Sequence, residues 1–182
     1  MTTIDLRIIK SKRDIQTGFM GLLQTKPFRE ITVNDICQTA LVGRSTFYRH
    51  YVDKYALLEA IVATQTRHFD DLLTQRLTAL EYDTGLVALY QDLTADRQTI
   101  LTLFAIHEPQ ADLSAAFFNS LKHHIDPLLQ QFSFTVPTTF IVELYATNAL
   151  TAIRWSLENG QVTDIATFMN DLLKPLLIKY RA

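Results

Sequence analysis

Cysteine is nearly absent from this chain of 182 residues, since Cys37 is the only one. A single thiol excludes an internal disulfide framework and a zinc site built from several cysteines, and it indicates a reducing compartment. Glycine and proline are also scarce, with five of each. This shortage of turn residues, together with the abundance of Leu, Ile, Ala and Thr in the later two-thirds, favours long helices over short strands.

Long apolar runs are missing as well. Charged residues interrupt the N-terminal segment MTTIDLRIIKSKRD within a few positions, so it lacks the pattern of a signal peptide. No uninterrupted apolar stretch approaches the length that a bilayer-spanning helix needs. We therefore expect a cytoplasmic protein with no membrane partner.

The motifs of common enzyme classes are absent too. The chain has no glycine-rich phosphate loop, no Gly-x-Ser-x-Gly elbow and no His-Glu-x-x-His pair. His123 and His124 are adjacent, so they point to different faces of a helix, and no two histidines are four residues apart. The expectation is a protein that is not an enzyme and has no catalytic residues, cofactor or metal.

Charge is present but unevenly distributed, around a net value of −2. Residues 1–55 contain nine Lys and Arg against five Asp and Glu, whereas the rest of the chain contains eight against fourteen. A basic first third on an acidic body is typical of a DNA-binding head attached to a body that does not bind DNA. The alternative is a chance asymmetry, because the excess is modest.

Helical periodicity accounts for most of the chain. The first expected helix, at residues 8–24, stops near Lys26-Pro27 because the residue before proline avoids the helical region. Its apolar face comprises Ile8, Ile15, Phe19, Leu22 and Leu23. Asp53 is placed to cap a long helix from Lys54 to about Arg76. Further amphipathic helices are expected at 85–94, 97–107, 112–132, 137–158 and 162–179. Asn159-Gly160 is the C-cap signal of the fourth of these helices, and Asp126-Pro127 would break or kink the third.

Two short helices precede the long one. The first begins with Thr32 as N-cap and Asp35 in the capping-box position. The second starts after Gly43, and its Phe47 and Tyr51 are four residues apart and face the core. The polar side chains left on its outer face are Arg44, Ser45, Tyr48 and Arg49. Two short helices joined by a tight turn have the layout of a helix-turn-helix, whose second helix lies in the DNA major groove.

With these residues laid out, the segment ITVNDICQTALVGRSTFYRHYVDKYALLEA resembles the TetR family of transcriptional regulators. The matched positions are Ile31-Thr32-Val33, Ala40-Leu41-Val42, Thr46-Phe47-Tyr48-Arg49-His50-Tyr51 and Lys54. Two positions depart from the family pattern. Leu41 replaces the usual turn glycine, at a cost of about 1 kcal/mol if its φ is positive. Gly43 replaces the usual serine cap.

The resemblance implies an all-α fold with two parts. Residues 1–53 would form a three-helix, helix-turn-helix DNA-binding domain, and residues 54–182 a helical effector-binding and dimerisation domain. The family usually builds its dimer seam from the last two helices. The implied function is a one-component regulator, usually a repressor, that binds a near-palindromic DNA operator as a homodimer and is released by a small-molecule effector. The alternative is a family-like co-activator that acts through a protein partner without binding DNA itself.

The candidate DNA-binding residues divide by role. Arg44, Ser45 and Thr46 are the candidates for base-edge contact, and Asn34 would reach a base or a phosphate. The candidates for phosphate contact, which set the register without reading sequence, are Thr32, Tyr48, Arg49, His50 and Lys54. Gly43, at the start of the second helix, is a further candidate DNA-binding residue.

Aromatic residues suggest an effector pocket in the C-terminal part, although ordinary core packing explains each of them when taken alone. Trp155 is either a further residue of this aromatic group or part of the dimer interface, because the small residues that precede it allow another helix to approach closely. Cys37 lies on a buried stripe and is expected to be a small core residue. The candidate effector-binding residues are Phe69, Tyr90, Phe104, His107, Phe117, Phe118, Phe140 and Tyr145.

Overall fold

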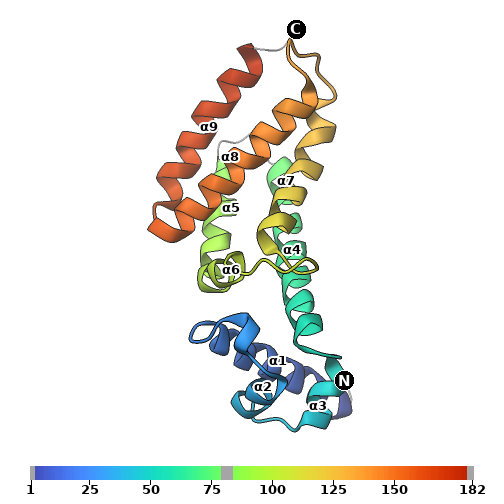
Figure 1. Cartoon of the computed structure of the whole chain (residues 1–182). Coiled ribbons are helices and arrows are strands. Elements are labelled where there is room, and N and C mark those ends of the chain that lie inside the picture. The colour runs from blue at the N-terminus through green and yellow to red at the C-terminus, as the bar shows by residue number, and fades with distance from the viewer. Residues whose placement is uncertain (1–2, 79–83, 180–182) are drawn as a thin grey trace. The chain divides into compact units, whose positions relative to one another are not determined.

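The computed structural model describes residues 3–78 and 84–179, and most of them are helical (Figure 1). The predicted all-α class is confirmed. Within the described ranges the one extended pairing is an isolated bridge between Glu108 and Ala111. The elements are α1 (Thr3–Leu23), the 3₁₀ helix η1 (Phe28–Glu30), α2 (Val33–Thr39), α3 (Arg44–His50), α4 (Lys54–Thr78), α5 (Thr84–Ala95), α6 (Arg97–Phe104), α7 (Leu113–Leu129), α8 (Thr138–Asn159) and α9 (Val162–Lys179).

The expected helix boundaries agree with these bounds to within a few residues, with two differences worth a reason. The helix expected at 97–107 ends at Phe104, because the chain then turns and the Ala111 N–H donates to the Glu108 carbonyl at 2.9 Å. Pro127 lies inside α7 without ending it, and the helix continues for two residues to Leu129. A proline so close to the C-terminal end removes little of the hydrogen-bond ladder.

The chain forms two compact units. The first comprises Met1–Thr64 together with Ala105–Ala111, and the second comprises Gln65–Phe104 together with Asp112–Ala182. Helix α4 therefore contributes its first turns to one unit and its later turns to the other. The expected domain boundary, between residues 53 and 54, lies at the start of α4, whereas the division into compact units lies within α4, between Thr64 and Gln65.

Helices α1, α2 and α3 pack on one another around an apolar core in the first unit (Figure 1). The side chains of Ile15, Phe19, Ile36 and Phe47 are completely buried. One expectation was wrong: Ile8 is 41% exposed, because α1 extends beyond the core at its N-terminal end.

Close approach of α1 and α2 depends on Gly18. A Cβ atom at this position would lie 3.0 Å from the backbone nitrogen of Ala40, so the two backbones meet where only hydrogen fits. This contact fixes α2, and the turn after it, against α1.

In the second unit, α7 packs on α8 while α9 packs on both α5 and α8. Helix α8 ends as expected at the Asn159-Gly160 pair, with Gly160 in the left-handed region at φ 74°. Within the described residues, no helix is both long enough and apolar enough to cross a membrane.

Candidate nucleic-acid interface

Helix α3 has a polar outer face and a buried apolar inner face. Gly43 is its N-cap and supplies no side-chain hydrogen bond, as its lack of a side chain dictates. Phe47 is completely buried and Tyr51 is 6% exposed, so both face the core as expected. The side chains of Arg44, Ser45, Tyr48 and Arg49 are exposed, and Thr46 is half-buried.

The exposed cations on α3 have no acidic partner close by. Among the described residues, no carboxylate lies within 4 Å of the guanidinium groups of Arg44 and Arg49. Two unneutralised cations on one exposed helical face give that face a positive potential, which is what a phosphate backbone attracts.

Two hydrogen bonds connect the C-terminal end of α3 to α1. The Ser11 hydroxyl lies 2.7 Å from Nε2 of His50, and the Gln16 amide donates to the Tyr51 hydroxyl at 3.2 Å. Burial, and then the nearby charges of Arg49 and Lys12, lower the pKa of His50, which favours the neutral ring. One of the two ring nitrogens of His50 therefore already has a partner within the chain.

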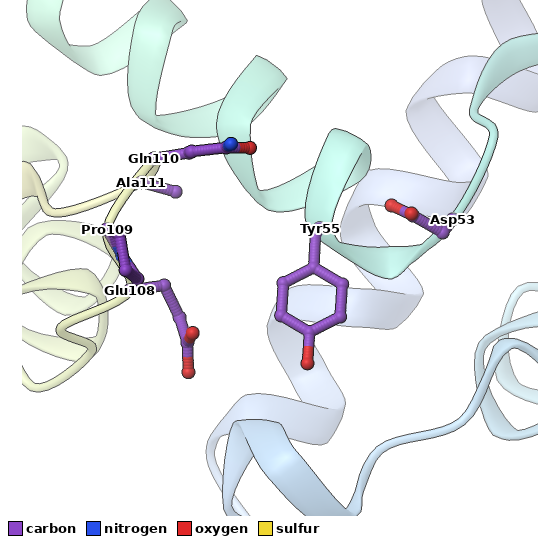
Figure 2. A pocket seen from close by; sticks show the side chains of 6 residues that line it. All are labelled: Asp53, Tyr55, Glu108, Pro109, Gln110 and Ala111. Atoms are coloured by element: carbon purple, nitrogen blue, oxygen red, sulfur yellow. The ribbon is translucent and has the colours of Figure 1, made fainter.

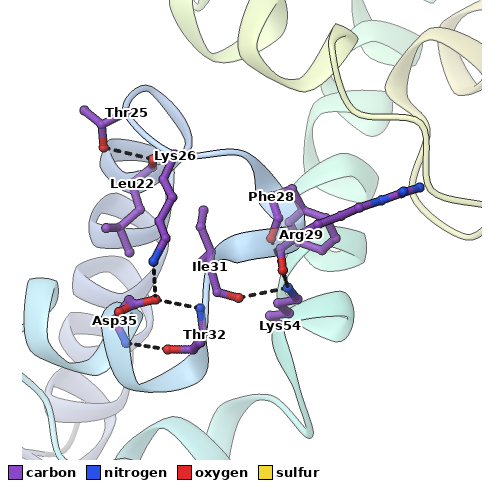
Figure 3. Close-up of polar contacts among 9 residues, drawn as sticks. All are labelled: Leu22, Thr25, Lys26, Phe28, Arg29, Ile31, Thr32, Asp35 and Lys54. Carbon is purple, nitrogen blue, oxygen red and sulfur yellow. Dashed lines mark hydrogen bonds and ion pairs between the residues drawn. The ribbon is translucent and has the colours of Figure 1, made fainter.

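Helix α2 starts with the capping box that the sequence predicts (Figure 3). The Asp35 N–H donates to the Thr32 hydroxyl oxygen at 3.1 Å, and the Thr32 N–H donates to the Asp35 carboxylate at 2.8 Å. The Lys26 ammonium donates to the same carboxylate at 3.0 Å. The backbone hydrogen bond from Thr32, followed by the one from Lys26, lowers the pKa of Asp35 to about 2. Asn34 and Thr32 are exposed beside this cap.

Lys54 has a role that the sequence did not suggest. Its ammonium donates to the carbonyls of Phe28, Arg29 and Ile31 at 2.9, 2.9 and 2.8 Å (Figure 3). It also lies 4.7 Å from the centre of the Phe28 ring. All three protons of the ammonium are therefore used to hold η1 and the strand-like residue after it. Burial lowers the pKa of Lys54, and Glu108 partly opposes that shift.

The turn between α2 and α3 closes with two hydrogen bonds. The Val42 N–H donates to the Cys37 carbonyl at 3.0 Å, and the Leu41 N–H donates to the Gln38 carbonyl at 3.3 Å. This pair defines a Schellman motif, in which the residue after the helix cap adopts the left-handed conformation. That residue is Leu41, with φ 54°, so the strained geometry anticipated for a leucine in place of glycine is present.

Cys37 is 6% exposed and lies on the buried stripe of α2, as expected. Burial raises the pKa of its thiol, and the positive charge of Arg44 opposes this only in part. A protonated thiol in a core is a small apolar group with little reactivity.

A hollow of about 360 Å³ lies in the first unit, between the start of α4 and the turn that follows α6 (Figure 2). Tyr55 stands in the middle of the view, and Glu108 points toward its ring. The Glu108 carboxylate pairs with the guanidinium of Arg29 at 3.7 Å. The lining residues are Asp53, Tyr55, Glu108, Pro109, Gln110 and Ala111.

Three of the expected effector residues pack against one another instead of lining an open space. The Phe69 and Phe117 rings are stacked with centroids 3.9 Å apart, and Phe104 meets Phe117 edge-on at 5.5 Å. All three side chains are buried. They form the aromatic core of the second unit, which agrees with the ordinary packing alternative.

The other expected effector residues differ in their surroundings. Tyr90 is 3% exposed, and burial raises its pKa strongly. Phe118 is half-buried beside the Lys122 ammonium. Phe140 is 57% exposed, and His107 is exposed in the turn that belongs to the first unit. The structure brings Phe69, Phe104 and Phe117 together, and the effector-binding role of all eight residues stays a prediction.

Sequence reasoning missed Arg76, the residue that joins two of these aromatics. Its guanidinium donates to the Tyr145 hydroxyl at 2.8 Å, and its charge acts on Tyr90. A signal was present in the sequence, because Arg76 follows Phe69 and Leu72 at helical spacing and so lies on the same face of α4.

The first part of the chain is similar to known proteins. A family model described as "Bacterial regulatory proteins, tetR family" matches residues 20–61, the segment from α1 into α4. A curated protein of Bacillus subtilis, described as an uncharacterized HTH-type transcriptional regulator YxbF, is 32% identical over 72 residues. That match covers 39% of this chain and about a fifth of the curated protein, 19% of its length.

Solved structures match over nearly the whole chain. A TetR transcriptional regulator from Streptococcus agalactiae is 27% identical, with a TM-score of 0.68 over 98% of this chain and 97% of that one. A complex of SmeT with triclosan is 14% identical, with a TM-score of 0.67 over 93% of this chain and 90% of that one. The second likeness shows the fold alone.

Proposed function

This chain belongs to the TetR family of bacterial transcriptional regulators, and from that premise we propose that it is a one-component regulator, acting in the cytoplasm, that binds a near-palindromic operator as a homodimer. The family and the fold are those of a transcriptional regulator, not of an enzyme. The single observation that carries the proposal is the exposed row Arg44, Ser45, Tyr48 and Arg49 on α3, with no carboxylate of the described residues near its two guanidinium groups.

In the proposed complex, Arg44, Ser45 and Thr46 read base edges in the major groove. Arg44 can grip a guanine through two hydrogen bonds, and such a contact is worth about 1–3 kcal/mol of discrimination. Tyr48 and Arg49 contact phosphates and set the register.

The remaining candidates flank these side chains. Thr32, Asn34 and Gly43 are exposed where α2 and α3 begin, which supports contact with the same backbone. His50 and Lys54 would act by positioning α3 and η1, since each has partners inside the first unit.

The dimer proposal rests on an exposed face of the second unit. Helix α8 carries apolar and small side chains at spacings of three and four, and all of them are exposed in the single chain. Phe168 on α9, the helix that packs beside α8, is 58% exposed. An apolar face of two adjacent helices is typical of an interaction surface. The members of the α8 stripe are Phe140, Leu144, Thr147, Thr151 and Trp155.

We further propose that a small-molecule effector binds the second unit and releases the operator. SmeT, which shares this fold, forms a complex with triclosan, and that supports a small-molecule ligand here. Arg76, Tyr145 and Tyr90 offer polar groups beside the aromatic core. Repression, rather than activation, follows the usual behaviour that the family resemblance implies.

Fluorescence anisotropy tests the DNA-binding step. Labelled DNA flanking the gene, or a duplex selected from a random library, should bind with an affinity that falls steeply as salt rises. Arg44→Ala should weaken binding about 10- to 100-fold and relax selectivity at one base pair of each half-site. Lys122→Ala removes one exposed positive charge from the second unit and should leave the affinity unchanged.

A different result would favour the alternative function. If the wild-type protein shows no sequence-selective, salt-sensitive binding but co-purifies with a stable heterologous partner, the chain is a co-activator and not an operator-binding protein. If Arg44→Ala and Lys122→Ala bind equally well, α3 is not the reading helix.

A further inference from the structure

Leu41 combines two unfavourable features. It is the one residue, among the described residues other than glycine, that has a positive φ. Its side chain is 92% exposed, more than any other exposed large apolar side chain in the described part of the chain, where Val52 follows at 78%.

Neither feature is offset within the chain itself. The Schellman motif after α2 requires the left-handed conformation at this position, and a side chain with a Cβ is strained there where glycine would not be. A side chain that is almost fully solvated buries no apolar surface that could compensate for the strain. Strain retained without an internal benefit is characteristic of residues that act on something outside the chain.

The position of Leu41 in the chain indicates which molecule its side chain can contact. It is three residues before Arg44, and three residues span at most about 11 Å. The major groove is about 12 Å wide. When the first turn of α3 enters that groove, a sugar–phosphate strand and the outer base edges are within reach of the Leu41 side chain.

We propose that Leu41 is a further DNA-contacting residue, whose side chain packs on an apolar carbon surface of the operator at the edge of the groove that receives α3. Two sources offer that surface, the C5-methyl group of thymine and the carbons of a deoxyribose. The proposal rests on the proposed function, because it requires the chain to bind an operator.

Three variants separate the effect of the apolar side chain from the effect of the backbone strain. Leu41→Gly removes both the apolar group and the strain. Leu41→Asn keeps comparable size, tolerates the left-handed region and is polar. Leu41→Met replaces the branched apolar group with an unbranched one of similar size and keeps the strain. Each variant is measured for thermal unfolding without DNA and for affinity to the selected operator duplex.

Stability and affinity should move in opposite directions. Leu41→Gly and Leu41→Asn should raise the melting temperature by about 2–4 °C. Both should weaken operator binding about tenfold, which corresponds to about 1.4 kcal/mol. Leu41→Met should retain most of the wild-type affinity at the wild-type melting temperature.

Operator duplexes with uracil in place of single thymines distinguish the two sources. If a methyl group is the contact, one substitution should weaken wild-type binding and leave the binding of Leu41→Gly unchanged. If the contact is a deoxyribose, no single uracil should change the operator affinity, and the ranking of the protein variants by affinity should stay the same.

The proposal is wrong if Leu41→Gly and Leu41→Asn bind the operator within twofold of the wild type. That result would leave the proposed function standing, because the wild type would still bind. If the wild type itself binds no duplex selectively, the proposed function fails and the role of Leu41 fails with it.

Discussion

Lys54 illustrates how one residue can match a family pattern and still do local structural work. Its ammonium satisfies three carbonyls that follow one another closely, those of Phe28, Arg29 and Ile31. The Ile31 N–H already donates to the Phe28 carbonyl at 3.2 Å, and the lysine adds a donor to that carbonyl and to each of the other two. The same ammonium would have to leave these carbonyls to contact a phosphate.

Replacing Lys54 by methionine separates the two roles. Lys54→Met keeps most of the aliphatic stem and removes the three charge-assisted hydrogen bonds, so we expect it to destabilise the protein by about 2 kcal/mol in the absence of DNA. Urea unfolding of the full chain, followed by circular dichroism, measures this.

Arg49→Met provides the contrast, since Arg49 is exposed on α3. It should change the unfolding free energy by no more than about 0.5 kcal/mol and should weaken operator binding. Equal unfolding free energies for Lys54→Met and the wild type would show that the three hydrogen bonds contribute nothing to stability.

At the scale of elements, two helices are each followed by a residue with positive φ, but the residues differ. The residue is Leu41 after α2, at φ 54°, and Gly160 after α8, at φ 74°. At α8 the Gly160 N–H donates to the Ser156 carbonyl at 2.8 Å and closes the left-handed cap. Glycine, the usual residue at such a position, follows α8, whereas the turn of the helix-turn-helix contains the strained Leu41.

Gly160→Ala should therefore destabilise the protein by about 1 kcal/mol, because alanine is strained at positive φ although open space surrounds its Cβ. Chemical denaturation of the full chain gives the value. Gly21→Ala is the matched control: Gly21 lies inside α1 with nothing within 4 Å of the added Cβ. Alanine there should stabilise by about 0.5–1 kcal/mol, and equal signs for the two variants would contradict this account.

At the scale of the whole molecule, the α8 stripe is the feature that an isolated chain leaves unexplained. Phe140 and Leu144 are 57% and 46% exposed, and Trp155 at the far end is 40% exposed. Exposed apolar groups raise the free energy of the single chain in water, and covering them with a second copy lowers it.

Leu144→Arg should convert the dimer to a monomer, because it buries an unpaired charge in the centre of the proposed seam. Sedimentation velocity at micromolar concentration measures the mass, and operator affinity should fall in parallel. Gln91→Arg adds the same charge to an exposed position of α5 and should leave the mass unchanged. A monomeric wild type would remove the dimer proposal.

Much of the fold could be predicted from the sequence because the relevant signals are local. The capping box at Thr32 and Asp35, the inward pair Phe47 and Tyr51, and the cap at Gly160 each depend on residues within one or two turns. The polar face of α3 follows from the same periodicity. The close approach at Gly18 was not predicted, since a glycine inside a helical pattern does not reveal which backbone lies against it.

The effector residues show what the sequence alone could not decide. Aromatic residues occur both in cores and in ligand pockets, so composition could not distinguish the stacked Phe69–Phe117 pair from an open site. His107 was expected to bind the effector, and it lies in the turn after α6, which belongs to the first unit.

The sequence by itself determined the helices, their caps and the side chains that α3 turns outward, because hydrogen bonds along one helix and the 3.6-residue period act over short distances. Only the tertiary structure decided which polar groups are already occupied. Lys54 and His50 meet partners more than twenty residues away, and no local pattern encodes such pairs. The same holds for Leu41, whose strain depends on the backbone of the turn and whose exposure depends on how the first unit packs around that turn.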